Sequence, residues 1–213
     1  MALEISLKGL NLLPLSAIVL ANILLFVAMT NLADFSVSHR SVQDLYSFIP
    51  AGMSFVIIGV LNGLVSTDIK ARIVFWRWSN PLPGSRAFSD LALRDDRIDL
   101  ERLRSNVGSF PDSPRDQNST WYRLFKSVEA LPEIRQNHKS YLLFRDYAFI
   151  SLLCLFLLGT LGFLIFPTMR LSWMYLGILA GQFVLVSIAA RNYGNRLITT
   201  VLAIKSTELQ EIK

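Results

Sequence analysis

The sequence has little charge, one cysteine and two histidines. Only 17% of its 213 residues are Asp, Glu, Lys or Arg, while 52% are hydrophobic and the mean hydropathy is +0.42. This composition is too apolar for an ordinary soluble domain, and it excludes intrinsic disorder. Because Cys154 stands alone, a disulfide-stabilised secreted scaffold is excluded as well.

Charge is missing altogether from four windows, which are 9–33, 45–67, 147–169 and 171–190. A helix rises about 1.5 Å per residue, so about 20 apolar residues cross the hydrocarbon layer of a bilayer. Every window is long enough. We therefore predict four transmembrane helices with cores near 12–29, 48–65, 148–166 and 171–190. We expect the first to be retained as a span, because its apolar run is too long for a signal peptide.

Lys and Arg are distributed unevenly between the segments that separate these spans. Nineteen of the 21 lie before the first span, in the long segment 68–146, or from Arg191 onward, and only Arg40 and Arg170 lie in the other two loops. Positively charged loops stay in the cytoplasm. Both termini and the long middle segment are therefore predicted to be cytoplasmic, and this orientation explains much of the net charge of +5.

The predicted fold class is an all-α integral membrane protein with a helical cytoplasmic domain between spans 2 and 3. This prediction divides the chain into four parts, which are a transmembrane hairpin (1–67), a cytoplasmic domain (68–146), a second hairpin (147–190) and a cytoplasmic tail (191–213).

Helix signals subdivide the cytoplasmic part. Residues 68–79 are expected to continue the second span as a helix, until the prolines and glycine of 80–84 end it. Asp95 or Asp96 is expected to cap a helix that runs to Val107, where Gly108 follows as a C-terminal stop.

Two further helix starts follow along the chain. Ser113 and Pro114 form an N-terminal signature for one helix. Pro132 begins another, and no breaker follows before Pro167. We therefore predict a single helix of about 34 residues that includes the third span.

Catalytic and metal-binding patterns are missing from the sequence. The two histidines, His39 and His138, are expected on opposite sides of the membrane, and we find no phosphate loop, zinc-ligand spacing or nucleophile elbow. The acidic residues of 95–101 alternate with arginines, which favours a solvated helix with pairs such as Asp99–Arg102 over a cation site. We expect no enzyme, no metal and no cofactor.

Three amides, Asn22, Asn62 and Gln182, lie within the predicted spans. Such side chains bond neighbouring helices together or line a hydrated pathway in an oligomer. Small residues also recur at the four-residue spacing that allows helices to approach closely, in the pairs Gly59 with Gly63 and Gly177 with Gly181. Packing inside one subunit and packing between subunits both fit this spacing, and we take a homo-oligomer as the working hypothesis.

Basic and aromatic residues alternate between Ile69 and Phe88, a stretch without any acidic residue. The basic residues of this stretch are Lys70, Arg72, Arg77 and Arg86. Cations beside aromatic rings suit the headgroup zone of membrane lipids. They suit a nucleotide or oligonucleotide ligand equally well, and these four residues are our candidate binding residues for such an anion.

The layout of two spans, a basic and aromatic cytoplasmic segment of about 80 residues, and two further spans resembles the small membrane subunits of bacterial antiphage systems. It is similar to the membrane effector of Hailong and to the membrane subunit of Kiwa. The resemblance implies an oligomeric inner-membrane protein that responds to infection. Such a protein either opens a pore under a nucleotide signal or recruits a soluble DNA-binding partner.

Two functions are consistent with these features. The first is a homo-oligomeric pore controlled through the cytoplasmic domain by an anionic ligand or a partner protein. In it the four basic residues contact the ligand, and Asn62 or Gln182 lines the path. The second is a non-conducting membrane sensor or anchor that holds a soluble partner.

Overall fold

The computed structural model describes residues 7–31, 56 and 60–208, and within these ranges the secondary structure is entirely helical. The chain forms two compact units. The apolar unit comprises Met1–Ser66 and Arg145–Ile188, and the polar unit comprises Thr67–Phe144 and Ala189–Lys213. Of the 21 basic residues, 17 belong to the polar unit.

Among the described residues, three helices are long and apolar enough to cross a membrane. They are α2 (Leu12–Asn31), α8 (Pro132–Ile165) and α9 (Met169–Thr207), and a short α1 (Leu7–Leu10) precedes the first. They correspond to the first, third and fourth predicted spans. The second predicted span lies largely outside the described residues, which include a helical stretch at 60–64.

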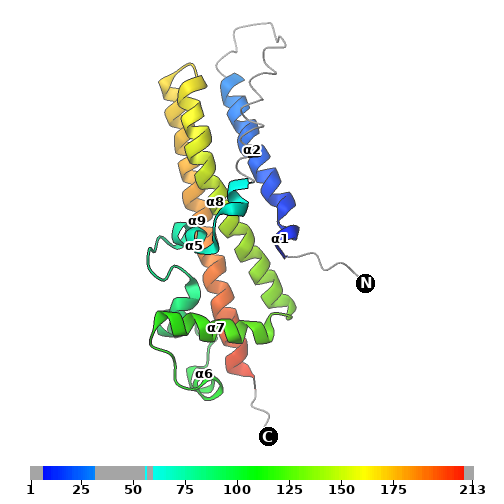
Figure 1. The fold of residues 1–213 in the computed structure, drawn as a ribbon, viewed down its shortest axis with the longest axis vertical. Coiled ribbons are helices and arrows are strands. Elements are labelled where there is room, and N and C mark those ends of the chain that lie inside the picture. The colour runs from blue at the N-terminus through cyan, green and yellow to red at the C-terminus, as the bar shows by residue number, and fades with distance from the viewer. Residues whose placement is uncertain (1–6, 32–55, 57–59, 209–213) are drawn as a thin grey trace, which may run out of the picture. The chain divides into compact units, whose positions relative to one another are not determined.

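The apolar unit is held together by one face of α2 and by aromatic packing. Phe26 lies in α2, and its ring centroid is 5.1 Å from that of Phe166 and 5.7 Å from that of Tyr175. Figure 1 shows α2 beside α8 in this part of the chain. The buried residues of α2 recur every three or four positions, as one helix face requires: Leu15, Val19, Ile23, Phe26 and Met29.

Large apolar side chains also point outward from the apolar unit. Leu13 is 81% exposed, Leu164 76% and Leu185 70%. In water such surfaces would be costly, whereas lipid chains solvate them as well as a protein interior does. The outward surface is therefore of the kind expected for helices that cross a membrane.

Short helices build the polar unit around the ends of α8 and α9. Their bounds are α5 (Thr67–Phe75), the 3₁₀ turn η1 (Pro83–Arg86), the π-helical turn η2 (Ala87–Leu91), the 3₁₀ turn η3 (Ala92–Arg94), α6 (Leu100–Val107) and α7 (Pro114–Val128). One hydrophobic core joins η2, α6 and the last turns of α9, through residues such as Phe88, Leu103, Ile198 and Leu202. Figure 1 shows α6 and α7 next to this part of α9.

Several predicted helix boundaries are confirmed. Ser113 caps α7 by accepting a 3.1 Å hydrogen bond from the Asp116 amide, and Pro114 is the first helical residue. Gly108 ends α6 with a φ of +88°. The predicted helix of about 34 residues is α8, which contains 34 residues from Pro132.

Other predictions in this region were wrong. The helix does not run unbroken from the second window, because Val65 and Ser66 are not helical. It ends at Phe75 rather than near 79, since Trp76 has a left-handed φ of +52°. The cap of α6 is Asp99, whose side chain accepts from the amides of the next turn, whereas Asp95 instead pairs with Arg97.

Most of the segment 191–213, predicted as a cytoplasmic tail, is helical. Residues from Arg191 to Thr207 continue α9, and Leu197, Ile198, Val201 and Leu202 are each at most 2% exposed. Asn106 donates a 2.8 Å hydrogen bond to the Lys205 carbonyl near the end of this helix. This part of α9 thus contributes to the hydrophobic core of the polar unit.

Candidate functional site

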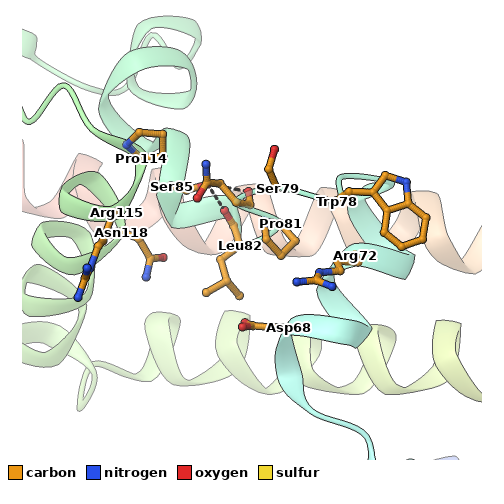
Figure 2. A pocket seen from close by; sticks show the side chains of 11 residues that line it. Asp68, Arg72, Trp78, Ser79, Pro81, Leu82, Ser85, Pro114, Arg115 and Asn118 are labelled. Atoms are coloured by element: carbon orange, nitrogen blue, oxygen red, sulfur yellow. Dashed lines mark hydrogen bonds between the residues drawn. The ribbon is translucent and has the colours of Figure 1, made fainter.

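A cavity of about 450 Å³ opens on the polar unit. Figure 2 shows Arg72 of α5 on one side and Arg115 and Asn118 of α7 on the other, with the segment around Pro81 and Leu82 between them. Asp68, Trp78, Ser79, Asn80, Ser85 and Pro114 complete the lining. Charged, amide and aromatic groups therefore meet in one concave site.

The segment 80–85 shapes this cavity through its own hydrogen bonds. The hydroxyl of Ser85 donates to the carbonyl of Asn80 at 2.9 Å and to that of Leu82 at 2.6 Å. Asn80 has a φ of +48°, a conformation that asparagine adopts more readily than most residues. A Cβ on Gly84 would collide with Oδ1 of Asn118 and lie 3.1 Å from Cε3 of Trp121, so a larger residue here would displace the Asn118 side chain that lines the cavity.

The cavity carries an excess of positive charge. Arg72 and Arg115 are exposed, and neither forms an ion pair with another described residue. Asp68 is the single acidic residue in the lining. Arg115 and Asn118 belong to the first turns of α7, where the helix dipole adds partial positive charge. These features favour an anion, and a guanidinium is well shaped to bind a phosphate or carboxylate.

A second group of arginines surrounds the C-terminal end of α5. The guanidinium of Arg86 lies 5.0 Å from the centroid of Phe75, and that of Arg191 lies 3.8 Å from the centroid of Trp76. Arg191 also donates through Nε to the carbonyl of Val74, in the last turn of α5. Burial, and then the positive charge of Arg77, lower the pKa of Arg86.

The four predicted binding residues do not meet in one place. Arg72 lines the cavity, whereas Arg86 belongs to the group around α5, where the like charge of Arg77 contributes to lowering its pKa. Lys70 is only 5% exposed and is not among the residues that line the cavity. Arg115 and Arg191 were not among the four predicted binding residues. They accompany the two groups because α7 packs on η1 and because Arg191 of α9 stacks on Trp76.

The predicted amides have protein partners. Asn22 is buried and donates to the Ile18 carbonyl of its own helix at 2.9 Å. Gln182 donates to the hydroxyl of Tyr147 at 3.0 Å and so bonds α9 to α8. Asn62 is half-buried and has an interaction of its own. Gln182 thus bonds two helices together, which is one of the two roles that the sequence allowed for these amides.

Three glycines of the predicted small-residue pairs lie within the described residues. Gly177 and Gly181 are exposed on α9, and no atom of the described part of the chain lies within 4 Å of a Cβ built on them or on Gly63. Gly59 lies outside the described residues. The close approach between α8 and α9 instead uses Gly159, where a Cβ would lie 2.9 Å from Leu176 Cδ1.

Acidic residues of 95–101, which follow η3, bond to nearby side chains. Arg97 donates to Asp95 at 2.7 Å and to Thr199 of α9 at 3.1 Å. The predicted Asp99–Arg102 pair is confirmed, with 3.3 Å between its nearest nitrogen and oxygen. The Arg97 guanidinium holds the pKa of Asp95 well below its usual range. These contacts dock this segment on α9.

A buried ion pair escaped prediction altogether. Arg145 donates to Asp146 at 2.9 Å, and their side chains are only 4% and 11% exposed. Adjacent opposite charges at the edge of a charge-free window carry no recognisable pattern in the sequence. Their burial depends on which residues pack around α8.

The fold defines a class rather than an individual function. Within the described ranges the protein is all helical, it has three helices suited to crossing a membrane, and it has a separate polar unit. No family model matches the chain, and comparisons with curated proteins and with solved structures found no similar protein.

Proposed function

We propose that this chain is a multi-pass protein of the bacterial inner membrane whose polar unit lies in the cytoplasm and binds an anionic ligand. The cavity between α5 and α7 is the observation that carries this proposal. It joins Arg72 and Arg115, neither of which has an ion-pair partner among the described residues, to a single acidic residue, Asp68.

The size and lining of the cavity favour a ligand as small as a mononucleotide. Its volume of about 450 Å³ is within the ~300–1,000 Å³ typical of small-molecule sites. Arg72 and Arg115 would bind the phosphate, the face of Trp78 would stack on the base, and Asp68 would accept a hydrogen bond from a sugar hydroxyl. An oligonucleotide would need a longer basic groove.

Calorimetric titration of the full chain in detergent tests this function, with AMP and inorganic phosphate as probes. We expect AMP to bind more tightly than phosphate, and Arg115→Gln to weaken AMP binding by about tenfold, the loss of one charge-assisted hydrogen bond. Arg123→Gln is the matched control, since Arg123 is an exposed arginine on the same helix that does not line the cavity. Absence of AMP binding, or equal effects of both variants, would contradict the proposal.

In this proposal the membrane helices hold a cytoplasmic receptor in place. The ligand would change how the polar unit engages a soluble partner protein, as the resemblance to antiphage membrane subunits suggests. Affinity purification with and without AMP tests this step, and a partner whose recovery does not depend on the ligand would contradict it.

A homo-oligomeric pore is the second candidate. The open face of α9 favours it, because Gly177 and Gly181 leave room for another helix backbone. It ranks below the receptor because Gln182, one of the two amides expected to line the path, already bonds to the hydroxyl of Tyr147. Conductance measured in planar bilayers, with and without AMP, separates the two. A silent protein under both conditions would exclude the pore.

A further inference from the structure

Three arginines gather at the end of α5, and none of them lines the cavity. Arg86 and Arg191 stack on the rings of Phe75 and Trp76. Arg86 also experiences the like charges of Arg77 and Arg191. We call these three residues the arginine cluster.

The cluster has little negative charge to balance it. The only ion pair that its members form within the described part of the chain joins Arg86 Nε to Asp90 at 3.9 Å. Asp90 is closer to Arg94, at 2.6 Å, so its charge is shared. The three arginines thus have one carboxylate among their ion-pair partners, and it is already engaged, which favours an additional anion.

Hydrogen-bond donors in the cluster are also left over. Nη1 of Arg86 and Nη2 of Arg191 are buried and have no acceptor among the described residues. Arg86 makes only a long 3.4 Å bond to Asn195, and Arg191 uses Nε for the Val74 carbonyl. Buried donors without acceptors are costly, and a phosphate has several oxygens that accept from guanidinium groups.

The place of the cluster along the chain indicates where such a phosphate would come from. Arg191 is the first charged residue after the charge-free window 171–190, and α9 is continuous across this point. If the window crosses the bilayer, Arg191 lies at the depth of the lipid headgroups. Trp76 is 55% exposed, and an exposed indole beside arginine is typical of this depth.

We propose that Arg77, Arg86 and Arg191 bind the phosphate group of an acidic phospholipid from the surrounding membrane. The aromatic rings of Phe75 and Trp76 hold two of the guanidiniums in fixed planes, which leaves their edges to bond the phosphate. A soluble phosphate ester has the same chemistry, but only the lipid arrives with the membrane surface. This site is separate from the cavity and does not depend on the function proposed for it.

Native mass spectrometry of the full chain in detergent tests the site, with phosphatidylglycerol and phosphatidylcholine as probes. We expect phosphatidylglycerol to bind preferentially. Arg77→Gln should reduce its binding about fivefold, the contribution of one basic residue near an anionic lipid. Arg196→Gln is the matched control, because Arg196 is an exposed arginine of α9 that forms no ion pair with another described residue. It should leave binding unchanged.

Arg77→Gln keeps the test interpretable, because Arg77 is exposed and Gln in its place should not disturb folding. The Arg191→Gln variant also loses the bond to the Val74 carbonyl at the end of α5. Circular dichroism therefore first checks that this variant keeps its helix content. Equal binding of both lipids, or an unaffected Arg77→Gln variant, would overturn the proposal. Displacement of phosphatidylglycerol by equimolar glycerol phosphate would assign the site to a soluble anion and would overturn the proposal of a lipid ligand.

Discussion

The two parts of α9 have opposite surfaces although they belong to one helix. In the apolar unit it exposes large side chains such as Leu185, at 70%, and its Gly177 and Gly181 are open. In the polar unit it buries Leu202 completely, and a Cβ on Gly194 would lie 2.8 Å from Phe75 and 2.9 Å from Tyr141. This contrast is expected of a helix whose first part faces lipid, which solvates leucine, and whose second part lies in the hydrophobic core of a polar unit.

The largest expected difference comes from truncating one leucine on each part. Leu202→Ala leaves a cavity in the core of the polar unit and should lower the free energy of unfolding by about 2–5 kcal/mol. Leu185→Ala should change it by less than about 0.5 kcal/mol, since its side chain makes few contacts. Chemical denaturation in detergent, followed by circular dichroism, measures both. Similar losses would remove the contrast between the two parts.

Adding one methyl group to a glycine probes the same contrast by overpacking. Gly194→Ala forces a Cβ against Phe75 and Tyr141 and should cost about 1–3 kcal/mol. Gly181→Ala meets no atom within 4 Å and should be neutral or slightly stabilising, because alanine favours the helix. Thermal unfolding of both variants checks this, and equal midpoints would show that α5 does not pack closely on α9.

Replacing one side-chain amide in each unit compares the two environments in a third way. Gln117 of α7 accepts from the amides of Phe88 and Ser89 at 3.2 and 3.1 Å, so Gln117→Leu leaves two backbone donors unbonded and should cost about 2 kcal/mol. Gln182→Leu removes only the bond to Tyr147 and should cost about 0.6 kcal/mol. Denaturant titration measures both. A larger loss for Gln182→Leu would reverse the comparison.

The smallest effect is a dependence on acid confined to the polar unit. Because the pKa of Asp95 is lowered by Arg97, its contribution is present above the unfolded pKa of about 3.9 and is lost as pH falls below it. An exposed pair of this kind contributes at most about 1 kcal/mol. Unfolding measured at pH 5 and pH 3 should show this loss in the native chain and not in Asp95→Asn. An identical loss in the variant would assign it to other carboxylates.

Local signals in the sequence predicted the elements that local rules control. The Ser113 cap and the length of α8 follow from residues within one turn of each boundary, and both are confirmed. The extent of α5 was predicted less well, because Trp76 adopts a left-handed conformation against the guanidinium of Arg191. That contact joins residues 115 positions apart in the sequence, and no periodicity reveals it.

The candidate sites show the same limit. The basic residues of the 69–88 stretch stood out by composition. Their separation into a cavity with Arg115 and a cluster with Arg191 depends on how α7 packs on η1 and how α9 meets the end of α5. Neither Gly194 nor Gln117 could be identified from the sequence. Gly194 allows a close contact with Phe75, and Gln117 bonds the amides of a turn 28 residues away. Only tertiary structure identifies such residues.

The proposed passage of α9 from lipid into the cytoplasm is open to a decisive labelling experiment. In a Cys154→Ala background, Ser119→Cys places a thiol at an exposed position of α7, and Thr168→Cys places one in the turn between α8 and α9. Bacterial spheroplasts are treated with a membrane-impermeant maleimide before and after permeabilisation. We predict that Thr168→Cys reacts in intact spheroplasts and that Ser119→Cys reacts only after permeabilisation. Reaction of Ser119→Cys in intact spheroplasts would contradict a cytoplasmic polar unit and, with it, the proposed receptor.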